Sequence, residues 1–206
     1  MAANSTVEIV NMAIVPLGAR PIAALDEGTK AATLANEMFD TERDALLQAH
    51  EWNFAVKRRS LAQDATAPTA INSDFSASFQ LPADYLRVIE VSPDSPYKVE
   101  GRKILSNETS LSVRYIAQIT SPSEWSPIFK SVLAARLKWR MAYALTESVS
   151  KEKAAGEEYL RLLNEARTID SQESGPELAT GSGADVLINQ RTTWGDGLAA
   201  GEWWRP

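Results

Sequence analysis

The spacing of apolar residues changes twice along this chain of 206 residues, and these two changes limit its fold most strongly. Up to about residue 55, apolar residues recur every three or four positions, which is typical of amphipathic helices. Between about residues 76 and 119 they alternate, as in strands with one buried face. From residue 127 the helical spacing returns. The order predicts a mainly α protein in which a small antiparallel β-sheet is inserted into a helical bundle.

Local signals mark the ends of the first two helices. Ser5 followed by Glu8 forms a capping box that starts the first helix, and Gly18 is suited to the left-handed residue that ends it. Thr29 is the expected N-cap of the second helix, which we expect to continue to about Trp52.

Two further helices follow the inserted sheet. Ser126 can cap the third helix, and Pro127 fits its first helical position. The fourth helix is expected from about Ser150 to Asp170. Four amphipathic helices are enough to bury one core, so the sequence predicts a four-helix bundle.

The alternating segment predicts three or four antiparallel strands within an insertion that covers residues 71–119. Gly101 is the expected positive-φ residue of a hairpin turn between two of them. The expected strands cover residues 86–91, 97–99, 103–105 and 111–116.

The end of the chain has a different composition. Residues 170–206 hold six acidic and two basic residues, six of the ten glycines and three of the six tryptophans. We therefore expect a helical bundle domain in residues 1–170 and an extended C-terminal tail in residues 171–206. A glycine-rich segment of this kind is not expected to fold alone.

Free tryptophans in such a tail favour docking on another protein over folding back onto the bundle. Tryptophan and arginine carry much of the binding energy in protein interfaces. The expected partner-binding residues are Arg191, Trp194, Trp203, Trp204 and Arg205.

Composition excludes several kinds of chemistry. The chain has no cysteine and a single histidine, His50, so disulfides, thiolate zinc sites and multi-histidine metal sites are ruled out. His50 is interpreted as a residue near a helix end. We expect no catalytic residue, no metal and no cofactor, and therefore no enzyme. A cell-wall hydrolase is the remote alternative, and it would need two carboxylates that converge on one cleft.

Two basic stretches stand out in a chain whose net charge is −6. One is residues 57–59. The other, in the third helix, contains Arg136, Lys138 and Arg140, with no acidic residue between Trp125 and Thr146. These cations could contact nucleic-acid phosphates, or pair with acidic residues of a neighbouring helix or subunit. The net acidic charge favours pairing, and we expect the three residues at contacts between subunits.

No apolar run reaches the roughly 18 to 20 residues of a membrane-spanning helix, and the first residues lack the pattern of a signal peptide. We therefore expect no membrane association, and folding in the cytoplasm of the cell that makes the protein.

Several sequence blocks follow one another in a specific order between about residues 7 and 170. They are NMAIVPLG at 11–18, Pro21 and Ile22, Ala24, Leu25 and Glu27, DALL at 44–47, WNFA at 52–55 with Arg58, Leu61 and Ala62, FQLPADYLR at 79–87, Tyr115 and Ile116, WSPIF at 125–129, LAARL at 133–137, Ala142 and residues 144–146, Tyr159 and Ala166. Together they resemble the tail tubular protein A family, the head-to-tail adaptors of tailed bacteriophages. Pro16 departs from the family's pattern, and the tail cannot be matched position by position.

The resemblance implies a structural protein of the virion, assembled in the cytoplasm of the bacterial host. Members form a ring, usually of twelve copies, that joins the portal protein to the tail tube or nozzle at the head–tail interface. DNA passes through the central channel without sequence-specific binding, and the C-terminal segment reaches the portal. From the residues alone, the alternative is a nucleic-acid-binding helical protein that uses the basic third helix.

Overall fold

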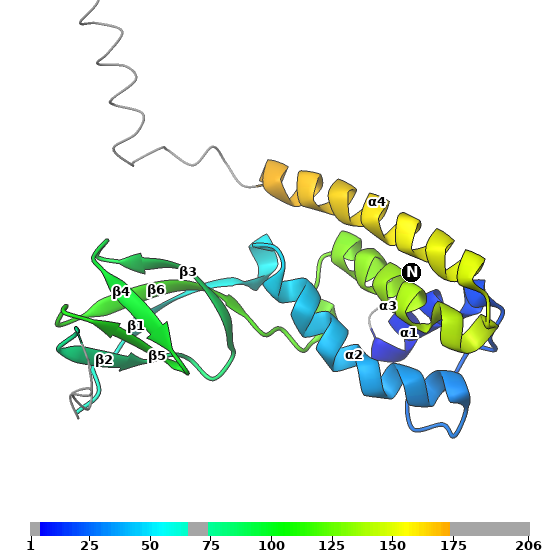
Figure 1. The fold of residues 1–206 in the computed structure, drawn as a ribbon, viewed down its shortest axis with the longest axis horizontal. Helices are drawn as coiled ribbons and strands as arrows, with labels where there is room; N and C mark the ends of the chain where they lie inside the picture. Colours follow the sequence, from blue (N-terminus) through cyan, green and yellow to red (C-terminus); the bar gives the residue numbers. More distant parts are fainter. Residues whose placement is uncertain (1–4, 66–73, 174–206) are drawn as a thin grey trace, which may run out of the picture. The chain divides into compact units, whose positions relative to one another are not determined.

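The computed structural model describes residues 5–65 and 74–173. The chain divides into two compact units, Met1–Ser171 and Gln172–Pro206. Of the described residues, about 51% are helical and 21% lie in strands (Figure 1). The protein is therefore a mixed α/β fold with two small sheets, and the expectation of a mainly α four-helix bundle was wrong.

The described residues contain four α-helices. They are α1 (Thr6–Ile14), α2 (Lys30–Gln48), α3 (Pro127–Thr146) and α4 (Val149–Glu173), with short 3-10 helices at Val15–Leu17, Asn53–Ala55 and Pro122–Glu124. The expected N-caps Ser5, Thr29 and Ser126 are confirmed, since the side chain of each accepts a hydrogen bond from the first turn of its helix. Gly18 closes the first 3-10 helix at φ 92°, as expected of a left-handed C-cap.

In the part of the chain that the structure describes, six strands form two antiparallel sheets. They are β1 (Val56–Leu61), β2 (Ala77–Gln80), β3 (Tyr85–Ser92), β4 (Tyr97–Glu100), β5 (Lys103–Ser106) and β6 (Leu111–Ala117). The first sheet has the order β1-β6-β3 and the second the order β2-β5-β4. The expected hairpin is confirmed as β4 and β5 around Gly101, whose φ is 60°.

The β structure is larger than the sequence predicted. The second helix ends at Gln48 instead of Trp52, and the basic residues 57–59 lie in β1. This strand precedes the predicted insertion at residues 71–119. It escaped detection because β1 is an edge strand in which only Leu61 is buried, so its residues show no alternation.

The helices are not packed as a symmetrical bundle. Both α1 and α2 pack against α3, whereas α4 lies beside α3 and meets it through large side chains, Trp139 stacking on Tyr159 (Figure 1). With only nine residues, α1 is too short to act as a full bundle helix. Three closely packed helices with a fourth on one side therefore replace the expected four-helix arrangement.

An aromatic cluster joins the end of α2 to the start of α3. Trp52 is fully buried, meets Phe129 edge to face at 5.1 Å, and donates a hydrogen bond from Nε1 to the Leu46 carbonyl at 3.0 Å. Phe54 and Trp125 pack on the same Phe129 ring. Because Trp52 leads directly toward β1, this cluster positions the first sheet against the helices.

Candidate functional site

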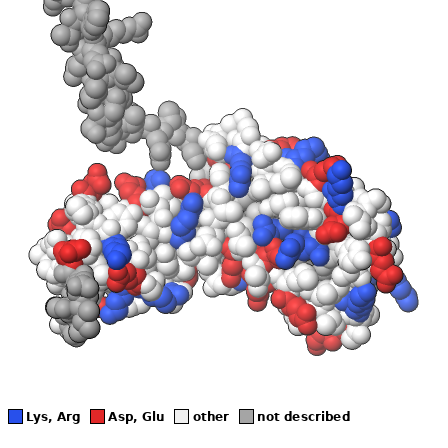
Figure 2. All heavy atoms as spheres, viewed as in Figure 1, with Lys and Arg blue, Asp and Glu red and all other residues white. Residues whose placement is uncertain are grey.

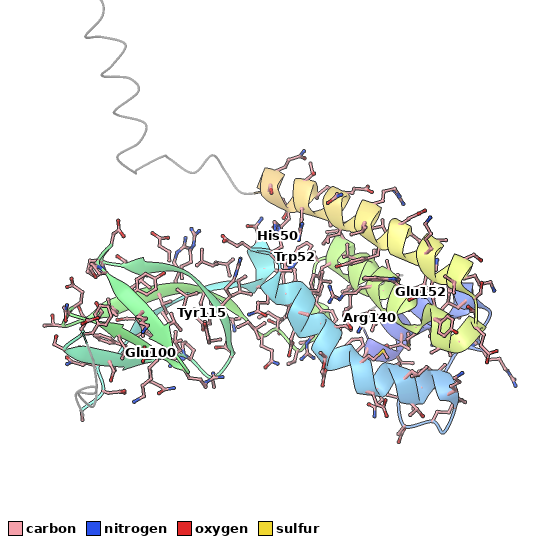
Figure 3. All side chains as sticks on the ribbon, in the orientation of Figure 1. His50, Trp52, Glu100, Tyr115, Arg140 and Glu152 are labelled. Atoms are coloured by element: carbon pink, nitrogen blue, oxygen red, sulfur yellow. The ribbon has the colours of Figure 1, made fainter. Side chains whose placement is uncertain are left out.

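The basic residues singled out on the third helix lie at a buried carboxylate. Glu42 of α2, whose side chain is 8% exposed, accepts a hydrogen bond from Nε of Arg136 on one oxygen and from Nε of Arg140 on the other, the latter at 2.8 Å. Arg136 is 20% exposed and Arg140 is 52% exposed. The two arginines, one helical turn apart, therefore tie α3 to α2, and Figure 3 shows Arg140 in this helical part.

Aromatic side chains extend the cluster to α4. Nη1 of Arg136 donates to the Tyr159 hydroxyl at 2.9 Å, and its guanidinium carbon lies 5.7 Å from the ring centre. Trp139 stacks on Tyr159 with ring centres 5.6 Å apart. Gly156 permits this approach, because a Cβ atom there would lie 3.1 Å from Nε1 of Trp139. The cluster thus joins three helices.

The electrostatics of the cluster favour permanent charge. Burial alone would lower the pKa of Arg136, but hydrogen bonds to Glu42 and Tyr159 raise it above its ordinary value. A guanidinium in this state neither accepts nor delivers a proton, so the arrangement is suited to holding helices together and not to acid–base catalysis.

Lys138, the third basic residue, pairs with Glu158 of α4 at 2.6 Å. The three cations that we expected at contacts between subunits thus have carboxylate partners on neighbouring helices of their own chain. This is one of the two kinds of partner that the pairing interpretation allowed. Their contact with a second subunit stays a prediction. The tail residues Arg191, Trp194, Trp203, Trp204 and Arg205 lie outside the described residues.

The sequence missed Glu42 as a functional position. The helical spacing of the sequence places Glu42 and Arg43 mostly on the polar face of the second helix, yet they are only 6% and 5% exposed. Arg43 is held by Asp40 at 2.6 Å and Asp44 at 2.8 Å, beside a hollow of about 450 Å³. The acid-free third helix was the available clue to Glu42, since its cations require acidic partners elsewhere.

A second polar cluster fastens the end of α4. The Asp170 side chain is 6% exposed; Oδ2 lies 3.1 Å from Nε2 of His50, and Oδ1 accepts from the Asn53 backbone N–H at 3.2 Å. The Asn53 side chain donates to the Asp170 carbonyl at 2.7 Å. His50 also meets the Trp52 ring edge to face, and Figure 3 shows the two together at the end of α2. His50 is therefore a structural residue, as its position near a helix end suggested.

No group of three or more His, Asp or Glu side chains within residues 5–65 and 74–173 is arranged to hold a metal ion. In the same residues, no helix combines the length and hydropathy needed to cross a bilayer. Figure 2 shows acidic and basic side chains interspersed over the visible face. No protein-family model matches this chain, and no curated protein is detectably similar to it.

Proposed function

We propose that this chain is a structural virion protein, a head-to-tail adaptor whose copies form a ring between the portal and the tail tube or nozzle. The proposal rests on the resemblance across residues 7–170 and on where the residues that carry it lie. Copies packed side by side would surround a channel for DNA, and many copies would make modest individual contacts sufficient.

The observation that supports the proposal most is that residues from separate blocks of the resemblance bond to one another. Each pair joins segments at least 11 residues apart through one or two hydrogen bonds of 2.8–3.1 Å. Residues that bond distant segments to one another help to determine the fold. Because these residues belong to the blocks that resemble the family, their bonds support a fold, and a structural role, shared with the family. The pairs are Asn11 with Ile22, Asp84 with Tyr115, and Arg136 with Tyr159.

The α3 cations give little support to the alternative of nucleic-acid binding by that helix. Arg136 and Lys138 are mostly covered and bound to carboxylates, so phosphate contact would have to break existing ion pairs. We therefore do not place nucleic acid on α3.

Measuring the mass of the protein alone and after mixing with its portal tests the adaptor role. Twelve copies of a 22.6 kDa chain give a ring of 271 kDa, and we expect a species of that mass joined to the portal. Deletion of residues 171–206 is expected to keep the helical circular dichroism spectrum while abolishing portal binding. A chain that stays monomeric in the presence of the portal would contradict the proposal.

A further inference from the structure

The outer face of the first sheet carries an arginine whose charge is not balanced. Arg58 of β1 lies directly opposite Arg114 of β6 in the antiparallel register. Arg114 has carboxylates 3.6 Å away on Glu51 and Glu90, whereas Arg58 is exposed and has no carboxylate partner within the described residues. Like charges placed directly opposite each other destabilise a sheet unless an anion lies between them.

The next row on the same face consists of three hydroxyl groups. Ser60 of β1 and Ser92 of β3 both lie opposite Ser112 of β6. Residues two apart on a strand face the same side, so this row adjoins Arg58 and Arg114. All three serines are exposed, and none of their hydroxyls bonds to a described residue.

We propose that this serine–arginine face, formed by Arg58, Ser60, Ser92, Ser112 and Arg114, contacts the phosphate groups of a nucleic-acid backbone. Arginine and serine side chains are among the groups that contact phosphate oxygens in such interfaces. The inference rests on the proposed function for the identity of the polyanion, because DNA is the polyanion that an adaptor channel would conduct.

The shape of the face favours a backbone over a single acidic side chain. Adjacent strands are about 4.8 Å apart, so the three hydroxyls form a line about 10 Å long. A line of donors matches the repeated oxygens of a phosphodiester chain better than the two oxygens of one carboxylate. The two rows contain no aromatic side chain on which a base could stack, so the contact reads no sequence.

The face carries only a small excess of positive charge, since the two carboxylates Glu51 and Glu90 offset all but one of the charges of Arg58, Arg114 and the neighbouring Arg87, which shares Glu51. Binding by one copy is therefore weak, and its dependence on salt is shallow because few phosphates are neutralised. Weak contact suits a surface past which DNA moves, and a ring would multiply it.

The neighbouring Arg59 provides a matched control. It lies on the same strand, is exposed and carries the same charge, but it is opposite Val113 and so belongs to the other face of the sheet. The experiment measures the anisotropy of a labelled DNA duplex against the concentration of the full chain at several salt concentrations. Arg58→Gln is expected to weaken binding about 3- to 10-fold and to reduce the slope of log K against log salt by about 1, whereas Arg59→Gln leaves both nearly unchanged.

Two further variants separate hydroxyl contact from charge. The triple change Ser60→Ala, Ser92→Ala and Ser112→Ala is expected to weaken binding without altering the salt slope, and Glu90→Gln is expected to strengthen binding. Circular dichroism checks that each variant is folded.

Several outcomes would overturn the inference. They are absence of binding at low salt, equal losses for Arg58→Gln and Arg59→Gln, and competition by polyglutamate as strong as that by unlabelled duplex, which would indicate an acidic protein partner. Ring mass is recorded on the same samples after the portal is added, so a ring that forms from a chain that does not bind DNA refutes this inference alone, whereas DNA binding by a chain that forms no ring with the portal refutes the adaptor role alone.

Discussion

The helical part and the two sheets hold their charges differently. Between the helices, Glu42, Arg136 and Asp170 are mostly covered and each has partners on another segment of the chain. On the second sheet, the pair Lys98–Glu100 is 65% and 52% exposed. Removing one member of a covered pair leaves a charge in a poor solvent, whereas water replaces the partner at the surface. The covered ion pairs therefore help to specify the helical arrangement, whereas an exposed pair such as Lys98–Glu100 adds little to the stability of its sheet.

The largest loss of stability is expected at the aromatic cluster of the helical part. Trp52→Ala removes a fully buried ring and its hydrogen bond to Leu46, and we expect a loss of about 3–5 kcal/mol in the free energy of unfolding. Urea denaturation followed by circular dichroism measures it. The matched change Tyr97→Ala, at a ring that is 41% exposed on β4, is expected to cost far less.

The next largest loss is expected at the covered carboxylate of Glu42. Glu42→Gln leaves Arg136 and Arg140 without a counter-charge, and we expect a loss of about 3 kcal/mol, at the lower end of the range because Arg140 is half exposed. Glu100→Gln removes the partner of Lys98 and is expected to leave the urea midpoint unchanged. Equal losses for the two variants would show that covered and exposed ion pairs contribute equally to stability.

Tyr115 tests whether the first sheet also depends on covered polar groups, because its buried side chain bonds to Asp84. Its hydroxyl donates to Asp84 at 3.1 Å, so Tyr115→Phe is expected to cost about 1–2 kcal/mol. A loss as large as that of Glu42→Gln would show that the sheets depend equally on covered charge.

The same network predicts an alkaline transition. Burial, together with the hydrogen bond to Asp84, raises the pKa of Tyr115 to about 12, above its ordinary value of 10.0. The unfolded chain therefore loses this proton first, and stability that is present below pH 10 is lost between about pH 10 and pH 12. Urea midpoints measured across this range should fall more steeply for the wild type than for Tyr115→Phe.

The smallest effect on stability is expected at the contact of α3 with α4. Gly156→Ala places a methyl group 3.1 Å from Nε1 of Trp139, which opposes the gain of about 1 kcal/mol from helix propensity. We expect stability within about 1 kcal/mol of the wild type but an altered near-ultraviolet circular dichroism spectrum, since the ring must shift. Gly28→Ala has no atom within 4 Å of its new carbon and should leave that spectrum unchanged. An unaltered spectrum for Gly156→Ala would mean that Trp139 does not stack as described.

Local signals in the sequence predicted local structure well. Caps such as Ser5 and Ser126 act within one turn, and the turn at Gly101 depends on its own backbone, so these elements follow from nearby residues. The burial of Glu42 depends on Arg136 and Arg140, which lie 94 and 98 residues further along. The edge strand β1 depends likewise on its pairing with β6. Partners so far apart in the sequence produce no periodic pattern of apolar residues. For this reason the sequence predicted a helical bundle in place of a mixed fold, and it predicted the basic residues of the candidate site but not Glu42.

The fastening of Asp170 has a mechanical consequence. A pull on the chain beyond Glu173 reaches the last turn of α4 and passes, through Asp170, into His50 and Asn53, 120 and 117 residues earlier. The force is thus shared with the α2–β1 junction, where Trp52 is buried, before the part of α4 that precedes Asp170 can unwind. Tension on the C-terminal end is resisted by the centre of the protein, not by its final helix alone.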